Sequence, residues 1–404
     1  MRARKPEPWD VVVVGAGITG VALGLALHQA GLRVRVLDRA APPPFVPSPA
    51  FDPRIYAISA ASQALLARVG GWQGIDPARI EPIRAMAIQG DGQGRLHFEA
   101  PGPDRPLGYI AESGALLDGL LAVVRRTVPD LVEAPVTVRL ETDAPEGKED
   151  RRECRTLLAG VSSASASTEY RTRLLVAADG LNSSVREQLG IAARFRPYGQ
   201  TAVVANYETD VPHGGVARQW FLPGEVVALL PLPGNRVSLV WSAREEHAQT
   251  LLALTPQERT AALQAVVGYG VGVLAERSQP AGFPLRWMRA ERLTAARAVL
   301  VGDAAHGVHP MAGQGLNLGL QDAAELADLL IHRGPGPDCG DAGLLRRYAR
   351  ARAEPVWAMQ GLTDGLYRLF GETRWGLPFA RNWGMSQVDR FSGLKALLVA
   401  QAGG

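Results

Sequence analysis

The beginning of the chain alternates between apolar runs and a glycine-rich turn. Asp10–Val14 ends in four consecutive valines, whose β-branched side chains favour a strand over a helix. Thr19–Gln29 has the pattern of a helix that Gly31 ends, and Arg33–Leu37 has the pattern of a second strand. The segment therefore predicts a β-turn-α-β unit of the Rossmann type.

The middle of the chain carries shorter runs with strand-like alternation. Between residues 136 and 170 these runs predict hairpin strands with exposed loops, and Leu174–Ala178 predicts a return to the core sheet. Between residues 201 and 285, turns at Pro223-Gly224 and Pro233-Gly234 separate further runs. A mostly antiparallel sheet is expected from Thr201–Tyr207, Ala217–Leu222, Val226–Leu230 and Arg236–Ser242.

Helical periodicity occurs in three further places. Ile55–Val69 has apolar residues at helical spacing after a proline-rich loop. Gly313 begins a second periodic stretch, and the chain from Ala342 onward is expected to be helical. The expected buried side of this last helix consists of Trp357, Leu362, Leu366 and Leu369.

Together these elements predict an α/β protein. A Rossmann-like domain is interleaved with a mostly antiparallel β-sheet domain, and helices follow at the C-terminal end. We expect the Rossmann-like domain to comprise residues 1–75, 109–200 and 291–340, the sheet domain residues 76–108 and 201–290, and the C-terminal helices residues 341–404.

The composition of the chain argues against several classes of function. The 404 residues include 47% hydrophobic and 21% charged residues, as in a globular protein with a large core. The net charge of +3 is spread over interspersed acidic and basic residues, so we expect no nucleic-acid partner. Cys154 and Cys339 form no CxxC pair, which argues against a metal site and favours a reducing cytoplasm. Glycines between Val11 and Leu32 argue against a membrane-spanning helix.

Three separate stretches have the features of a dinucleotide site. Gly15, Gly17 and Gly20 mark the turn before the first helix, where free N–H groups and the helix dipole favour phosphate. Asp38 follows the second strand, where an acid accepts hydrogen bonds from a ribose. The other two stretches are Ala178-Asp179-Gly180 and the run from Val301-Gly302-Asp303 to Leu316-Asn317. Their combination predicts FAD in a discontinuous site.

Three kinds of residue leave alternatives open. Arg54 is expected either against the pyrophosphate or flavin, or as a solvated arginine at a helix start. His306 and His309 flank the third stretch, where a histidine is more often a structural hydrogen-bond partner than a proton carrier. Trp220, Phe221, Trp241 and Phe283 either line a pocket over the flavin or fill the core of the sheet domain.

With these residues placed, the chain resembles the class A flavoprotein monooxygenases over essentially its whole length, and more narrowly the ubiquinone-biosynthesis hydroxylases. The most specific match is the run His309-Pro310-Met311-Ala312-Gly313-Gln314-Gly315-Leu316-Asn317, continuing to Asp322. Supporting matches are Asp52–Ser59, Leu229–Leu232 and the tail from Arg381 to Lys395. One departure is Glu112, which is followed here by Ser113-Gly114.

The resemblance implies a fold like that of para-hydroxybenzoate hydroxylase and a set of site residues. The implied cofactor contacts are Gly15, Gly17, Gly20, Asp38, Arg39, Arg54, Asp179, Gly180, Gly302, Asp303, Pro310, Gly313, Gly315, Leu316 and Asn317. The implied flavin-facing loop contains His309, Pro310, Gly313, Gln314 and Gly315, without an assigned catalytic base. The expected substrate pocket is lined by Trp220, Phe221, Pro231 and Trp241, and no metal is expected.

The resemblance also implies the chemistry. Reduced flavin reacts with O2 at carbon 4a to give a hydroperoxide that transfers one oxygen atom to an electron-rich ring, with NADPH or NADH as the reductant. The implied substrate is a polyprenylated phenol of ubiquinone biosynthesis, whose lipid tail suggests peripheral association with the inner membrane face or with a biosynthetic complex. Alternatives are a hydroxylase of a small soluble phenol or aromatic acid, and a flavoprotein partner that does not hydroxylate. Whether the chain forms a homo-oligomer stays open.

Overall fold

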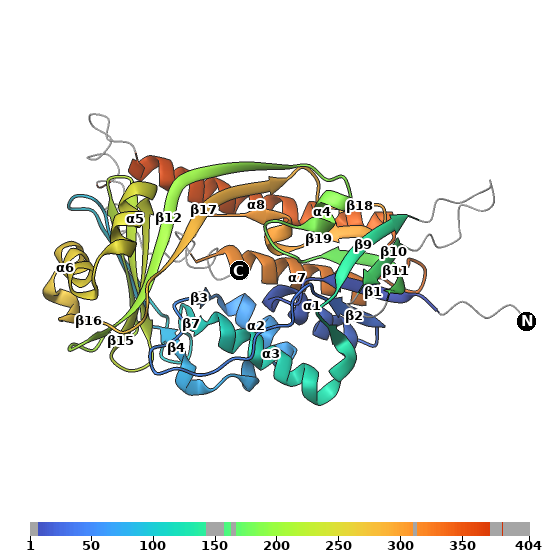
Figure 1. Cartoon of the computed structure of the whole chain (residues 1–404), viewed down its shortest axis with the longest axis horizontal. Coiled ribbons are helices and arrows are strands. Elements are labelled where there is room, and N and C mark those ends of the chain that lie inside the picture. Colours follow the sequence, from blue (N-terminus) through green and yellow to red (C-terminus); the bar gives the residue numbers. More distant parts are fainter. Residues whose placement is uncertain (1–6, 143–156, 163–166, 310–312, 372–381, 383–404) are drawn as a thin grey trace, which may run out of the picture.

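The structure is a computed structural model that describes residues 7–142, 157–162, 167–309, 313–371 and 382. These residues form three β-sheets with helices packed on them, and the chain passes between the sheets several times (Figure 1). The predicted class, a Rossmann-like part interleaved with a mostly antiparallel sheet, is confirmed. The boundaries of the individual segments stay a prediction.

The first sheet is built around β1 (Trp9–Val14), which pairs in parallel with β2 (Val34–Leu37) and with β11 (Ser167–Ala177). Between β1 and β2 the chain forms α1 (Ile18–Gln29), so the predicted β-turn-α-β unit is present. The sheet also includes β8 (Val132–Glu133), β9 (Thr137–Thr142), β10 (Leu157–Ser162), β18 (Thr294–Ala295) and β19 (Ala298–Leu300).

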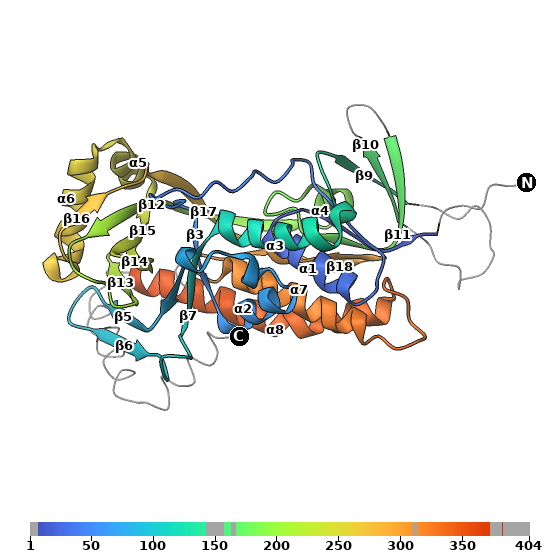
Figure 2. The same ribbon diagram turned by 90° about the horizontal axis from the view of Figure 1, so that it is seen from below.

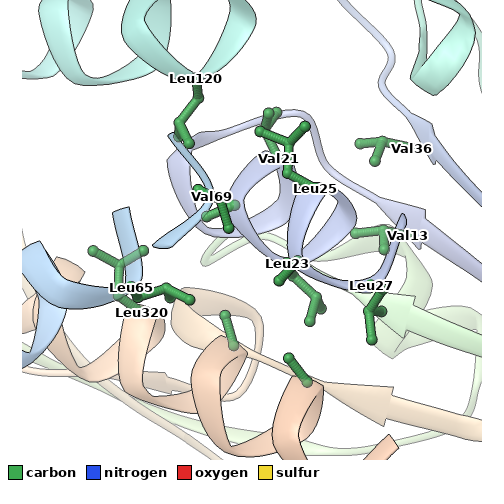
Figure 3. Close-up of a cluster of buried hydrophobic side chains, with 14 of the residues drawn as sticks. Val13, Val21, Leu23, Leu25, Leu27, Val36, Leu65, Val69, Leu120 and Leu320 are labelled. Atoms are coloured by element: carbon green, nitrogen blue, oxygen red, sulfur yellow. The ribbon is translucent and has the colours of Figure 1, made fainter. Parts of the chain in front are cut away.

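Helix α1 lies in the centre of the largest apolar core. Its residues pack among the sheet and three other helices, namely α2 (Ala60–Arg68), α3 (Ser113–Thr127) and α7 (Gly315–Ile331). Figure 3 shows Leu23 and Leu27 of α1 on the side of α7. Burying each such side chain contributes roughly 1.5–3 kcal/mol. This packing fixes the N-terminal end of α1, where the first glycine turn lies.

The second sheet is mostly antiparallel, and β12 (Ala193–Thr209) is its longest strand. The strand order is β20-β17-β12-β15-β14-β13-β5-β6, and β16 pairs with β12. The bounds are β5 Ala85–Gln89, β6 Arg95–Glu99, β13 Val216–Leu222, β14 Glu225–Leu232, β15 Arg236–Arg244, β16 Leu274–Glu276, β17 Ala281–Ala290 and β20 His306–Gly307. The four predicted runs between residues 201 and 242 are therefore confirmed as strands.

Side chains of the second sheet alternate between two faces. The outer face packs against α5 (Glu245–Ala253) and α6 (Pro256–Val267). The inner face, as the term is used below, consists of Ala202, Val204, Asn206, Val226, Ala228, Leu230, Ser238, Val240 and Ser242, which are matched across β12, β15 and β14. None of these side chains is charged.

A small third sheet connects the other two. It consists of β3 (Ile55–Ile58), β7 (Gly108–Glu112) and β4 (Ile80–Ile83), with β7 in the middle. Leu230 of the inner face packs in one cluster with Ala57 of β3. The Asn206 Nδ2 group donates to the Phe51 carbonyl oxygen at 3.1 Å. The inner face therefore turns toward β3 and the loop that precedes it.

Two helix predictions need correction. Ile55–Val69 is not one helix, because its first four residues pair with β7 as β3 and Ser59 then caps α2 by accepting from the Ser62 N–H. The C-terminal helix α8 (Ala342–Gly371) exists, but Trp357 is 65% exposed and Leu362 is 51% exposed. Leu369 is also exposed, and the buried side carries Val356, Gln360, Thr363 and Phe370 instead.

Helix α8 runs along the molecule, from the first sheet near β18 to the second sheet near β13 (Figures 1 and 2). Within the described residues, none of the helices combines the length and hydropathy that crossing a lipid bilayer requires.

Candidate functional site

The first and second motif turns are in direct contact. Gly15 has a φ of +117°, and a Cβ atom there would lie 2.2 Å from the Ala178 carbonyl oxygen. A Cβ atom on Gly20 would lie 1.9 Å from the Gly15 carbonyl oxygen. Larger residues cannot occupy either position without moving the backbone. The two turns meet because β1 and β11 are parallel neighbours whose carboxyl ends lie at one edge of the sheet.

Gly17 has a different role in the same turn. It is the N-cap residue of α1, no described side chain caps that helix, and the first turn contains no acidic residue. A Cβ atom at Gly17 would have no atom within 4 Å. The N-terminal end of α1 therefore has no side-chain cap and has open space beside Gly17, which fits a pyrophosphate.

Asp38 lies beside this turn at the end of β2. Its carboxylate accepts from the Ala16 N–H at 2.6 Å and from the Ala40 N–H at 3.0 Å. Carboxylate oxygens have further acceptor capacity, so the group fits a ribose hydroxyl donor. The neighbouring Arg39 is exposed to solvent.

Asp179 is hydrogen-bonded within the protein, whereas Gly180 borders open space. The Asp179 carboxylate accepts from the Ser183 hydroxyl at 2.5 Å and from the Val185 N–H at 3.1 Å, at the start of α4 (Ser184–Gln188). Gly180 has a φ of +84° and open space where a Cβ would be. Asp179 thus holds the shape of the turn, while Gly180 leaves room beside it.

The third motif meets α1 through small residues. Gly302 has a φ of +59°, and a Cβ atom there would lie 3.5 Å from the Gly319 Cα of α7 and 3.7 Å from the Thr19 side chain of α1. Asp303 follows in a short 3-10 turn. Asp303 is exposed to solvent, yet the protein atoms packed around it desolvate its carboxyl group. This desolvation raises the pKa of Asp303. Asp322 raises this pKa further, whereas His306 opposes the shift.

A buried network of charged residues near Asp303 is centred on Asp322. The Asp322 carboxylate contacts His306 Nε2 at 2.6 Å, Arg352 Nε at 2.6 Å and the Gly302 N–H at 2.8 Å. Burial alone would raise the pKa of Asp322, but His306, Arg352 and the Gly302 N–H lower it below its usual value. In the sequence, Asp322 ends the matching run that begins at His309, but no role was predicted for it. Arg352, which lies on α8, was not predicted.

Asn317 joins the start of α7 to the third sheet. Its Oδ1 accepts from the Ser59 N–H at 2.9 Å, and its Nδ2 donates to the Ala57 carbonyl oxygen at 2.9 Å. Gly313 has a φ of +61°, and a Cβ atom there would lie 3.2 Å from the Ala57 Cβ. Asn317 therefore uses its polar atoms within the protein, where it fixes the loop against β3.

The N-terminal end of α7 resembles that of α1. Gln314 is its N-cap, Gly315 is its first residue, and Leu316 is half-buried. No described side chain caps α7, and its first turn lacks an acid. The positive dipole end of α7, like that of α1, therefore has no side-chain cap among the described residues. Pro310, predicted to face the flavin, lies outside the described residues.

His309 is completely buried and packs against residues of β12. Its Nε2 hydrogen-bonds Gln200 Oε1 at 2.8 Å, which makes Nε2 the donor. The ring packs edge-on against Tyr198 and stacks on Tyr367 of α8 at 5.6 Å between centroids. Burial lowers the pKa of His309 to about 4. The imidazole is therefore neutral at pH 7, as expected for a structural hydrogen-bond partner. Sequence reasoning missed Gln200, Tyr198 and Tyr367.

Arg54 lies beside Phe283 of the second sheet and close to Tyr56 of the third sheet. Its guanidinium carbon lies 5.2 Å from the centre of the Phe283 ring. Burial raises the pKa of the neighbouring Tyr56, Asp303 adds to the increase, and Arg54 opposes it. Arg54 and Asp303 thus act on one tyrosine, although they are far apart in sequence. Arg54 precedes the strand β3 and not a helix, so the helix-start alternative is wrong, while a contact of its exposed side chain with the pyrophosphate or flavin stays a prediction.

Glu112 holds the loop that contains Asp52 and Arg54. It is fully buried, pairs with Arg79 Nη2 at 2.5 Å and accepts from the Asp52 N–H at 2.6 Å. The Ser113 N–H donates to the Arg54 carbonyl oxygen at 2.9 Å. The unusual sequence after Glu112 therefore still contacts the loop through its backbone.

The predicted pocket aromatics are divided between the two faces of the second sheet. Trp241 is buried in the outer-face core, Trp220 packs against the same core, and Pro231 follows the same alternation. For Trp220 and Trp241 the core-filling alternative describes the structure, and Pro231, expected in the pocket, also lies on the outer face. Phe221 belongs to the inner side, but it is 5% exposed and stacks on Phe370 at 3.9 Å.

Half-buried apolar residues lie on the inner side instead. These are Ala228, Leu230, Val240 and Phe283. Val240 and Phe283 pack in one cluster with Tyr198 and Tyr367, the residues that enclose His309. An uncharged, partly accessible surface therefore adjoins the flavin-facing loop. One-residue alternation separates Val240 from Trp241, so hydrophobicity alone cannot tell which of the two lies on the inner face.

Comparisons with known proteins agree with this site. Residues 8–363 match the family model described as FAD binding domain. The chain is 35% identical to a ubiquinone hydroxylase, UbiL, of Rhodospirillum rubrum, covering 98% of this chain and 89% of the relative. It is 32% identical to the 3-demethoxyubiquinol 3-hydroxylase of Escherichia coli, covering 96% and 97%. The solved structure of PqsL of P. aeruginosa with 2-aminobenzoylacetate has a TM-score of 0.76 and 23% identity, covering 94% of this chain and 100% of PqsL.

The structural likeness shows the fold, and the family match explains the convergence of the three motifs. Open space at Gly17 and Gly180, two helix N-termini without a described side-chain cap and the Asp38 carboxylate together fit FAD. The chain therefore belongs to the family of FAD-binding class A monooxygenases that includes the ubiquinone hydroxylases, enzymes that use FAD, NAD(P)H and O2.

Proposed function

We propose that the protein hydroxylates the aromatic ring of a polyprenylated phenol in ubiquinone biosynthesis. The observation that carries the proposal is the uncharged inner face beside the flavin-facing loop, in a chain that is 35% identical to a ubiquinone hydroxylase. An apolar surface suits a prenyl tail and an aromatic ring, while the Arg54 guanidinium beside Phe283 makes a small aromatic acid the alternative to be tested.

The protein residues have distinct proposed roles. The α1 N-terminus at Gly17 binds the pyrophosphate, and Asp38 binds the adenosine ribose. The α7 N-terminus at Gly313–Gly315 directs its positive end at the flavin ring and favours the anionic form that reduction produces. When bound, reduced FAD activates O2 for transfer of one oxygen atom to the substrate ring.

The inner face has the proposed role of excluding water. Ala228, Leu230, Val240 and Phe283 are the proposed lining, and their apolar surface keeps the reacting ring dry. His309 keeps the loop in place through its Nε2–H bond to Gln200, and its pKa of about 4 makes it a weak base. A phenolic ring is already electron-rich, so the described residues need not supply a strong base.

The substrate class can be tested with purified FAD-loaded protein. NAD(P)H oxidation is measured with a short-chain prenylated phenol and, separately, with small aromatic acids, while the hydroxylated product is quantified. The proposal predicts product formation with the prenylated phenol. Stimulation by small aromatic acids alone would favour a hydroxylase of soluble phenols, and the absence of any product would favour a partner that does not hydroxylate.

Deleting the gene in the source organism would identify the substrate independently. The quinone precursor that accumulates should be a prenylated phenol that lacks one ring hydroxyl group, which would also name the ring position. We further propose that the protein binds peripherally to a membrane surface or to a biosynthetic complex, since its substrate carries a lipid tail. Normal quinone levels in the deletion strain would contradict the proposed pathway.

A further inference from the structure

The C-terminal half of α8 has an exposed apolar side. Trp357 is 65% exposed and Leu362 is 51% exposed, and between them the sequence contains no charged residue. Ala358, Gly361 and Gly365 are also exposed and lie on the same side of the helix. These five residues are called the α8 surface below.

Basic side chains flank the α8 surface along the helix. Glu354 is the exposed acid among the described residues of α8, whereas the exposed arginines of this helix are Arg346, Arg347, Arg350 and Arg368. The Arg289 guanidinium lies 4.6 Å from the centre of the Trp357 ring and donates to Gln360 Oε1 at 2.6 Å. A tryptophan beside arginines is typical of the boundary between lipid tails and headgroups.

The opposite side of the same helix segment contacts the candidate site. Gln360 Nε2 donates to the Gly307 carbonyl oxygen at 3.2 Å, close to the flavin-facing loop. Tyr367 stacks on His309, and Phe370 stacks on Phe221 of the second sheet. One helix thus connects the exposed apolar side with the residues that enclose the proposed substrate surface.

We propose that the α8 surface docks on an anionic lipid bilayer and holds the proposed substrate site near the membrane. The inference rests on the proposed function, because a lipid-tailed phenol resides in the bilayer. Two large apolar side chains are far too few for a stable dimer, which buries about 1,200–2,000 Å². Arginines complement anionic headgroups, and their aliphatic stems extend the apolar contact.

The test uses full-length FAD-loaded protein and sedimentation with vesicles. Phosphatidylcholine vesicles are compared with vesicles that also contain phosphatidylglycerol. Wild type should bind the anionic vesicles, and added salt should weaken this binding. The double variant Trp357→Ser, Leu362→Ser should bind about tenfold more weakly. A second variant, Arg347→Gln, Arg350→Gln, should lose binding to the anionic vesicles selectively.

A matched control changes another exposed apolar pair. Tyr269 is 76% exposed and Val273 is 58% exposed, and both lie beside α6 on the outer side of the second sheet. Tyr269→Ser, Val273→Ser should bind vesicles like wild type. The inference is overturned if this control loses binding instead, if the α8 variants bind like wild type, or if wild type binds neither vesicle. A change in oligomeric mass rather than vesicle binding would assign the α8 surface to a second copy of the chain.

Activity separates this inference from the proposed function. The α8 variants should hydroxylate a short-chain prenylated phenol in dilute detergent at the wild-type rate, but should be slower with a long-chain phenol embedded in vesicles. If wild type hydroxylates neither phenol, the proposed function fails regardless of vesicle binding. If wild type hydroxylates both and the α8 variants do so equally well, only the membrane inference fails.

Discussion

His309 shows how burial decides the chemistry of a single residue. An unfolded histidine has a pKa of about 6.5, whereas burial lowers the pKa of His309 to about 4. Between these values the unfolded chain binds a proton that the folded chain does not bind. The contribution to stability is therefore complete above about pH 6.5 and decreases as the pH falls toward 4.

This shift predicts a specific pH dependence of unfolding. Between pH 7 and pH 5, His309 should account for a loss of about 2 kcal/mol in the free energy of unfolding. His309→Gln should be less stable at pH 7 but should lack this part of the decrease, which urea unfolding at both pH values can measure. His332→Gln, at an exposed histidine, is the control. Equal pH dependence in His309→Gln and wild type would contradict the account.

The Asp322 network predicts a large effect from one buried arginine. Arg352→Met leaves the Asp322 carboxylate without its guanidinium partner, which should cost about 3–5 kcal/mol and weaken FAD retention through Gly302. Arg68→Met removes the exposed partner of Asp328, on the same helix as Asp322, at 2.9 Å, and should cost under about 1 kcal/mol. Urea unfolding of the two variants compares them directly, and similar losses would show that the buried network has no special role.

At the scale of elements, variants at two glycines of the first turn should affect different properties, folding at Gly15 and FAD binding at Gly17. Gly15→Ala places a Cβ 2.2 Å from the Ala178 carbonyl oxygen, so the protein should be unstable and colourless. A Cβ at Gly17 meets no atom within 4 Å, so in Gly17→Val the fold should persist while FAD affinity falls about a hundredfold, or ~2.7 kcal/mol. Fluorescence titration with FAD and circular dichroism measure the two effects.

The control for the glycine variants is Gly336→Val, because a Cβ at this exposed loop position also meets no atom. It should keep both its fold and its FAD. Stoichiometric FAD in Gly17→Val would show that the α1 N-terminus does not bind the pyrophosphate.

The elements also show what the sequence could predict. The valine run and the glycine turn determine β1 and α1 locally, so this unit was predicted correctly. Ile55–Ile58 has helical spacing, yet it forms β3 because tertiary pairing with β7 outweighs local periodicity. Trp241 and Val240 are adjacent, and only the sheet register decides which faces the site. Arg352 could not be assigned, because nothing local marks an arginine whose partner lies on another helix.

At the scale of the whole molecule, the site lies where the first and second sheets approach the third. The first sheet provides the glycine turns, the second provides the uncharged inner face, and β3 holds Gly313 through Ala57. Helix α8 spans this arrangement, with Arg352 behind the third motif and Tyr367 beside His309. The buried side of α8 therefore contacts both the cofactor motifs and the residues beside the proposed substrate surface.

The most direct test of the account is a turnover experiment with isotopically labelled O2. FAD-loaded protein, NADPH or NADH, and a short-chain prenylated phenol are mixed under labelled O2, and the product is analysed by mass spectrometry. The account predicts one labelled oxygen atom on the ring and one reductant consumed per product. Reductant consumption without a labelled prenylated product, at any phenol concentration, would contradict it.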